Sequence, residues 1–155
     1  MNIELIAAAI TTALAPFMPF LIEIGATTSK KIVDVVSEKS GEEAWNLAQE
    51  LWNKIKIYFE NDADIKGAAL MVSAKPKDES RQTLLAVALT EKLKENPKLA
   101  QELFDLLGGQ SAVQRVLANR KSWVKDVTQK INGSGEQTIK ADNNSRIQGV
   151  KQIKK

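Results

Sequence analysis

The chain contains no cysteine and no histidine among its 155 residues. The missing thiols and imidazoles exclude disulfides, cysteine nucleophiles, histidine bases and nearly every zinc, haem or iron–sulfur site. No Gly-rich phosphate-binding loop, dinucleotide-binding glycine motif, nucleophile elbow or zinc-protease motif occurs either. At 17.1 kDa, the chain also leaves no room for a two-domain cofactor enzyme. We therefore expect no enzymatic activity and no cofactor.

The closest groups of carboxylates do not change this expectation. They are Glu42 with Glu43, Asp62 with Asp64, and Asp78 with Glu79, all at predicted helix starts or connections. An acidic side chain near the start of a helix is stabilised by the helix dipole and by the free backbone amides there. Helix capping therefore explains these residues without catalysis.

Positive charge is concentrated in the last third of the chain. Residues 108–155 contain ten basic and three acidic side chains, whereas residues 30–107 contain 12 basic and 14 acidic ones. A local excess of basic residues binds anionic lipid or nucleic acid, or keeps a region in water. Because the basic tail, residues 133–155, has no nucleic-acid-binding motif and no interleaved aromatic residues, we expect no nucleic-acid partner.

The longest apolar run spans residues 5–22, which contain no charged side chain and lie between Glu4 and Glu23. As a helix this run is about 27 Å long, just under the thickness of a bilayer core. No basic residue precedes it, which argues against a secretory signal, and Pro16 and Pro19 argue against a permanent anchor. The run predicts a buried core helix of a soluble bundle. A small membrane-anchored protein stays open as an alternative.

The chain from residue 30 to residue 107 has the periodicity of short helices joined by short connections. A third helix shows a stripe of large apolar residues at spacings of three and four, and a stripe of this kind is typical of a helix in a core. Asp78 and the pair Asn96–Pro97 are good starts for two further helices. Five or six helices with short connections predict an all-α helical bundle over residues 1–107. Its apolar faces after the first helix include Ile32, Val33, Val35 and Val36, then Trp45, Ala48, Trp52, Ile55 and Phe59.

Residues 108–132 predict a basic amphipathic helix or linker after the helix break at Gly108–Gly109. Ser111 with Gln114 matches the capping box, in which each side chain bonds the other residue's free amide. Ser40 with Glu43 matches the same box at the start of the third predicted helix. Val113, Val116, Leu117, Arg120, Trp123, Val124, Val127 and Ile131 follow with helical periodicity, which predicts one helix over residues 111–131. Its basic side chains fit two alternatives, docking on the bundle or contact with an anionic membrane.

The composition changes again in residues 133–155. Gly133, Ser134 and Gly135 predict a flexible linker, and apolar and polar residues then alternate on either side of the turn-forming residues 142–145. Two short strands around a turn are not stable alone in water, but stacked copies pair every backbone group. The segment is therefore a tail that is either disordered or able to form cross-β structure.

Three motifs in the first 107 residues resemble the bacterial Bell domain. They are ALAP at 13–16 within the uncharged helix, GEEAW at 41–45 leading into AQELW at 48–52, and NPKLAQEL at 96–103. Bell domains are helical cell-death execution domains related to fungal HeLo domains, to plant cell-death domains and to the four-helix domain of the mixed-lineage kinase-like pseudokinase. The resemblance covers residues 1–107 and implies the same helical bundle.

Residues 136–153 resemble the amyloid signalling motifs that follow such domains, in length, position and content of Gly, Asn and Gln. The segment IQGV at 147–150 is similar to the I-Q-x-G core of necroptosis amyloid motifs, although Gly directly follows Gln here. The residues assigned to the motif are Gln137, Ile139, Ala141, Asn143, Asn144, Ile147, Gln148, Gly149, Val150 and Ile153.

The resemblance implies a cell-death effector of bacterial immunity against phage, cytoplasmic at rest. A nucleotide-binding receptor with a matching motif would template self-assembly of the tail, and the crowded bundles would permeabilise the inner face of the cell membrane through their first helices. A non-lytic helical adaptor, recruited through the same tail, is the alternative. The expected membrane-acting residues are Ile3, Leu5, Ile6, Ile10, Leu14, Phe17, Phe20 and Leu21.

Overall fold

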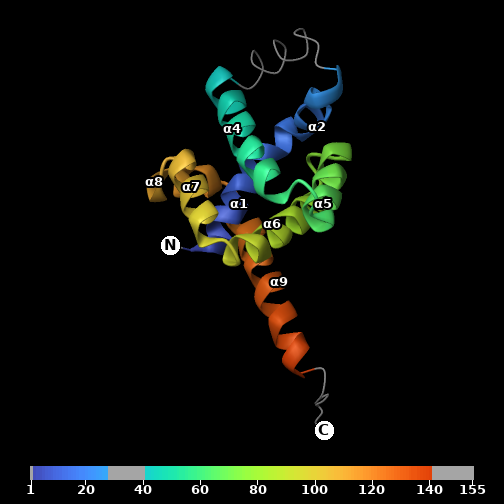
Figure 1. The fold of residues 1–155 in the computed structure, drawn as a ribbon. Coiled ribbons are helices and arrows are strands. Elements are labelled where there is room, and N and C mark those ends of the chain that lie inside the picture. Colours follow the sequence, from blue (N-terminus) through green and yellow to red (C-terminus); the bar gives the residue numbers. More distant parts are fainter. Residues whose placement is uncertain (1, 28–40, 141–155) are drawn as a thin grey trace. The chain divides into compact units, whose positions relative to one another are not determined.

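A computed structural model describes residues 2–27 and 41–140 of the chain (Figure 1). Every regular element in these two ranges is a helix and no strand occurs in them, which confirms the predicted all-α class. The predicted second helix, at Ile32–Val36, lies outside the described residues, as do residues 141–155. The elements are α1 (Ile3–Leu14), η1 (Ala15–Phe17), α2 (Met18–Thr27), α4 (Glu42–Phe59), α5 (Ala63–Ala74), α6 (Glu79–Lys94), α7 (Pro97–Leu107), α8 (Gln110–Leu117) and α9 (Lys121–Lys140).

The chain divides into two units, Met1–Val124 and Lys125–Lys155. The first unit contains the bundle, together with α8 and the first residues of α9. In the second unit, the described part is the remainder of α9.

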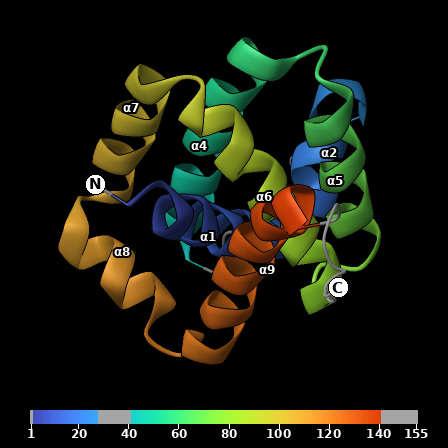
Figure 2. The same cartoon turned by 90° about the horizontal axis from the view of Figure 1, so that it is seen from below.

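Helix α1 lies at the centre of the first unit, packed against α4, α6, α7 and α8 (Figure 2). Its middle is formed by Ala7, Ala8 and Ala9, none of which has any exposed surface. Small side chains on a central helix allow its neighbours to approach closely and leave few voids. The predicted core helix is therefore the helix around which the others pack.

The apolar run bends where the prolines lie. Pro16 falls within η1, a short 3-10 turn between α1 and α2, and Pro19 falls in the first turn of α2, where its missing N–H leaves no hydrogen bond unmade. At the bend, Phe17 of η1 packs against Trp45 of α4, and their ring centroids are 5.4 Å apart. Helix α2 then packs against α5. The run is thus one apolar stretch in two helical pieces.

The predicted aromatic stripe is confirmed as core. Trp45, Ala48, Trp52 and Ile55 are buried on α4, and Phe59 at its end is half-buried. Two helix starts are also confirmed, because Asp78 accepts a hydrogen bond from the Arg81 amide and Asn96 accepts one from the Leu99 amide. These local patterns were sufficient to locate α4, α6 and α7.

The capping box predicted at Ser111 and Gln114 does not form, and Ser40 of the other predicted box lies outside the described residues. Helix α4 begins after Gly41 and α8 begins after Gly109, with φ of 88° and 85°, and neither helix has a side-chain cap. Ser111 lies inside α8 instead of at its start. A positive φ is readily adopted by glycine alone, and at these positions the chain enters the helix from a backbone conformation that Ser does not favour.

The single helix predicted over 111–131 is wrong, because α8 ends at Leu117 and α9 begins at Lys121. The Ala118 and Arg120 amides bond the carbonyls of Arg115 and Leu117, three residues back, which closes α8 in a tight turn. Leu117 before the turn and Trp123 after it are both buried. The turn therefore allows both side chains to join the core.

The predicted linker at Gly133–Gly135 is helical, since α9 continues through it to Lys140. No proline interrupts residues 121–140, so every backbone N–H there remains available to the helix. Gln137 and Ile139, assigned to the amyloid motif, accordingly lie in α9 and not in a strand.

Candidate functional site: the buried N-terminal helix

The residues expected to act on membranes lie along α1, η1 and α2, mostly facing the core. Of the eight, Ile6, Ile10, Leu14, Phe17 and Leu21 are buried, and Ile3, Leu5 and Phe20 are half-buried. Among the described residues, one helical stretch, Ile3–Ile22, is long and apolar enough to cross a membrane, with a mean hydropathy of 2.0. Length and composition alone give that result, and the core helix of a soluble protein also satisfies them.

Both threonines of α1 are satisfied within the helix itself. The Thr11 hydroxyl donates to the Ala7 carbonyl at 2.9 Å, and the Thr12 hydroxyl donates to the Ala8 carbonyl at 2.9 Å. A hydroxyl bonded four residues back needs no partner outside its own helix. Neither hydroxyl hydrogen is therefore left unpaired in the apolar interior.

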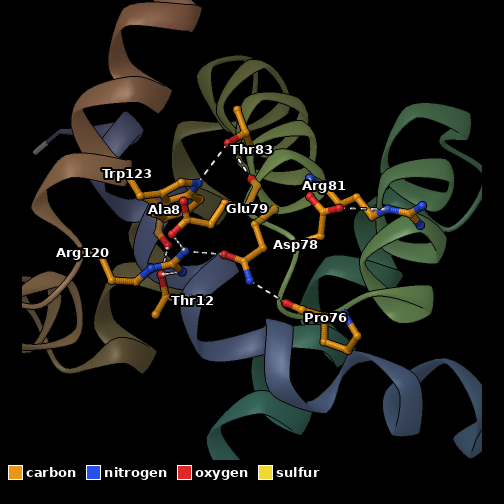
Figure 3. A network of polar contacts seen from close by, with 10 residues as sticks. Ala8, Thr12, Pro76, Asp78, Glu79, Arg81, Thr83, Arg120 and Trp123 are labelled. Carbon is orange, nitrogen blue, oxygen red and sulfur yellow. Dashed lines mark hydrogen bonds and ion pairs between the residues drawn. The ribbon is translucent and has the colours of Figure 1, made fainter.

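One contact from a distant part of the sequence holds the last turn of α1. The Arg120 guanidinium donates from Nη1 to the Thr12 hydroxyl at 3.1 Å and from Nη2 to Gln82 Oε1 (Figure 3). Its central carbon also lies 3.9 Å from the centre of the Trp123 ring, a cation–π stack. We call Arg120, Thr12, Gln82 and Trp123 the arginine clamp.

The other polar groups of the arginine clamp also have partners. Trp123 Nε1 donates to the Thr83 hydroxyl at 3.0 Å, and this hydroxyl donates to the Glu79 carbonyl at 2.9 Å. Gln82 Nε2 donates to the Pro76 carbonyl. The clamp therefore connects the start of α9 to α1, to α6 and to the connection before α6.

The charge of Arg120 is only partly balanced by the protein. Its side chain is 18% exposed, and the nearest carboxylate oxygen, on Glu79, lies 3.8 Å away on a side chain that is 68% exposed. Burial lowers the pKa of Arg120 and Glu79 raises it, but a guanidinium stays protonated at any physiological pH. The clamp therefore holds a permanent positive charge next to the uncharged stretch 5–22.

The arginine clamp decides between the two alternatives for residues 111–124. Val113, Leu117 and Trp123 are buried, and Arg120 is bound within the bundle, so this part docks on the bundle instead of presenting its aromatic residue to a membrane. Sequence analysis did not find Thr12 or Gln82 as partners. The available signal was Arg120 itself, a charged residue at an apolar position of the helical period.

The amyloid-motif residues from Ala141 onward lie outside the described residues. Within residues 2–22 and 41–132, no group of three or more acidic side chains is placed to hold a metal ion. Of the carboxylates considered above, two cap helices: Asp62 accepts from the Ile65 amide at 3.0 Å, and Asp78 accepts from the Arg81 amide at 3.2 Å.

Comparison with known proteins adds no relative. No protein-family model, no curated protein and no solved structure matches the chain.

Proposed function

We propose that the chain is a cell-death effector that permeabilises membranes through its N-terminal helix after its C-terminal tail assembles. The observation that carries the proposal is the uncharged stretch 5–22, which lies at the centre of the bundle and has its hydroxyl groups bonded internally. Such a helix is kept soluble by its neighbours, yet it needs no polar partner in lipid.

Transfer to a membrane compensates for what the helix loses in the bundle. Burial of each large apolar side chain, such as Ile6, Ile10 or Leu14, is worth about 1.5–3 kcal/mol relative to water. A bilayer provides the same apolar environment, whereas water does not. Release is therefore expected only at a membrane surface, and the resting chain is expected in the cytoplasm.

Assembly of the tail supplies the trigger in this proposal. Cross-β stacking of residues 133–155, templated by a nucleotide-binding receptor with a matching motif, brings many bundles together. A high local concentration converts a weak membrane affinity per chain into a strong collective one. The outcome is permeabilisation of the inner face of the cell membrane and death of the infected cell, as in phage defence.

A non-lytic adaptor is the second candidate, and one observation favours it. Five of the eight expected membrane-acting residues are buried as in any core helix, so the run can serve folding alone. In that function the tail recruits a partner and the bundle stays closed.

The test compares bacteria expressing the full chain with bacteria expressing a chain that ends at Asn132, with growth and dye entry measured after the tail is nucleated by a fused assembly domain. The variant Ala13→Glu places a charge near the middle of the run, at a half-buried position. Ala88→Glu, half-buried on α6, is the matched control. A charge at the centre of a membrane-spanning helix opposes insertion by about 3 kcal/mol.

The proposal expects toxicity and dye entry for the full chain and for Ala88→Glu, and neither for Ala13→Glu or the shortened chain. Circular dichroism of the purified variants checks that both remain folded. Assembly in which dye stays excluded from cells with the full chain would overturn membrane killing and leave the adaptor. Fractionation of the full chain with membranes before assembly would instead indicate a permanently anchored protein.

A further inference from the structure

A cavity of about 660 Å³ lies beside the arginine clamp, at the bend between α1 and η1. Thr12 and Pro16 line it from the N-terminal run, Lys75 and Lys77 line it from the connection between α5 and α6, and Arg120 lines it from the start of α9. All of these residues belong to the first unit. The cavity thus places three cationic side chains next to the helix that the proposed function releases.

Arg120 has unused hydrogen-bonding capacity at this cavity. A guanidinium carries five N–H donors, and the hydrogen bonds of Arg120 within the described residues are those to Thr12 and Gln82. The 3.8 Å separation from Glu79 is too long for a hydrogen bond. A charge that is largely buried and incompletely paired is unfavourable, so an additional anion would stabilise it.

The remaining charges at the cavity also favour an anion. Lys75 and Lys77 are exposed, and within residues 2–22 and 41–132 neither forms an ion pair. Asp78 is the carboxylate in the wall; one of its oxygens accepts from the Arg81 amide at 3.2 Å, and the other lies 3.8 Å from Arg81 Nε. The wall therefore has more positive than negative charge, which gives the cavity a positive potential.

We propose that this cavity binds a phosphate group, held by Arg120, Lys75 and Lys77, and that binding withdraws Arg120 from Thr12. A guanidinium matches the oxygens of a phosphate with two parallel N–H bonds between opposite charges, whereas its bond to Thr12 is a single bond to a neutral hydroxyl. The phosphate thereby competes with Thr12 for the same guanidinium. Two sources have this chemistry, the headgroup of an anionic phospholipid and free phosphate.

The consequence for α1 rests on the proposed function. When Arg120 leaves Thr12, the residue just before α9 loses its hydrogen bond to the last turn of α1. Phosphate occupancy would then make release of that helix easier, and a lipid headgroup would do so only where a membrane is present to receive it. Binding of phosphate at the cavity is independent of any membrane and is tested without one.

Calorimetric titration of the full chain tests the site. The ligands are inorganic phosphate, short-chain phosphatidylglycerol below its micelle concentration, and short-chain phosphatidylcholine as the zwitterionic comparison. The variant Lys75→Ala/Lys77→Ala removes two cations from the cavity, and Lys94→Ala/Lys98→Ala removes two exposed cations elsewhere. We expect the first pair to weaken binding about tenfold and the second to change it less than about twofold.

Binding of phosphatidylglycerol but not of inorganic phosphate assigns the site to a lipid headgroup, and the reverse assigns it to free phosphate. Equal affinity of both double variants and the unaltered chain would overturn the site, as would the absence of binding by any of the ligands. The measurement contains neither bilayer nor assembled tail. The two proposals are therefore tested separately. A chain that does not kill cells leaves the phosphate site untouched as a proposal, and a chain that does not bind phosphate leaves membrane killing untouched.

Tryptophan fluorescence tests the withdrawal of Arg120. Because Arg120 stacks on Trp123 at 3.9 Å, its movement is expected to change the emission of that ring. The variant Trp123→Phe retains Trp45 and Trp52 and is expected to lose the ligand-dependent change. Saturating phosphate that leaves the emission of the unaltered chain constant would overturn the competition with Thr12.

Discussion

Gly108 ends α7 with φ of +110°, and its amide bonds the Asp105 carbonyl. A Cβ at this position would lie 3.0 Å from the Ala112 Cβ, tighter than ordinary van der Waals contact. Gly67 is the reverse case, a helical glycine in α5 whose Cβ would meet nothing within 4 Å. The same substitution to alanine is therefore expected to have opposite signs at the two positions.

We expect Gly108→Ala to lower the free energy of unfolding by about 1–2 kcal/mol, the cost of a left-handed backbone for an ordinary residue. Gly67→Ala is expected to raise it by about 0.5–1 kcal/mol, because alanine restricts the unfolded chain and suits a helix. Urea unfolding of both variants measures the two changes. Changes of the same sign would contradict the backbone conformations at these residues.

Arg120 makes its contacts through the planar fork of its guanidinium. Lysine keeps the charge but cannot reproduce the two bonds to Thr12 and Gln82 together with the stack on Trp123. We expect Arg120→Lys to lower the free energy of unfolding by about 1–3 kcal/mol, the usual worth of hydrogen bonds to a charged group. Urea unfolding measures the change.

Arg115→Lys on the exposed face of α8 is the control for this prediction, since Arg115 forms no ion pair within the described residues. A change within about 0.5 kcal/mol is expected there. If both variants lose the same amount, the stability of the bundle does not depend on the geometry of the arginine clamp.

Helices α5 and α6 are joined by an ion pair that also caps α5. Asp62 accepts from the Ile65 amide through one oxygen, and the other oxygen lies 2.9 Å from Lys92 Nζ. The hydrogen bond from Lys92 is the main reason that the pKa of Asp62 lies below its ordinary value, and the same bond raises the pKa of Lys92. This contribution to stability is therefore pH-dependent.

A lowered pKa in the folded chain means that the contribution is fully present above the unfolded pKa of Asp62 and is lost as pH falls through the folded one. We expect Asp62→Asn, which retains a cap acceptor, to unfold in acid with a weaker pH dependence than the unaltered chain. Thermal unfolding across the acidic range measures this. Asp64→Asn, at a carboxylate that is 74% exposed and 4.0 Å from Lys92 Nζ, is expected to leave the pH dependence nearly unchanged.

Helical periodicity and caps predicted α4, α6 and α7, because their signals lie within a few consecutive residues. The break between α8 and α9 could not be predicted in this way. Residues 110–132 contain no glycine or proline, and the apolar period continues through the turn with Arg120 at one of its positions. What ends α8 is the burial of Leu117 and Trp123 on the bundle, together with bonds to residues far away in the sequence.

The contacts of α1 with the arginine clamp could not be predicted from local sequence patterns either. The apolar character of residues 5–22 predicted a buried helix, and α1 is one. Because nearly every side of this helix is apolar, no pattern in it indicates which side faces which neighbour. The contact between Thr12 and Arg120 joins residues 108 positions apart and exists only once the bundle has formed.

At the scale of the molecule, release of α1 has unequal consequences for the other helices. Helix α8 has its extensive contacts with α1 and α7, so it loses much of its packing when α1 leaves. Helix α6 packs most extensively against α1, but it keeps its contacts with α5 and α7 when α1 leaves, and α5 packs against both α6 and α2. A bundle that opens by releasing α1 is therefore expected to loosen at α8 and to persist at the pair α5–α6.

Hydrogen exchange read by mass spectrometry distinguishes this opening from unfolding. In the resting chain, amides of α1 are expected to exchange only through global unfolding, because they lie in the core. After the tail is nucleated in the presence of anionic vesicles, peptides covering α8 are expected to lose protection while those covering α5 and α6 keep it. Loss of protection in α5 and α6 as well would mean that the bundle unfolds, and unchanged protection in α8 would mean that it stays closed, as an adaptor requires.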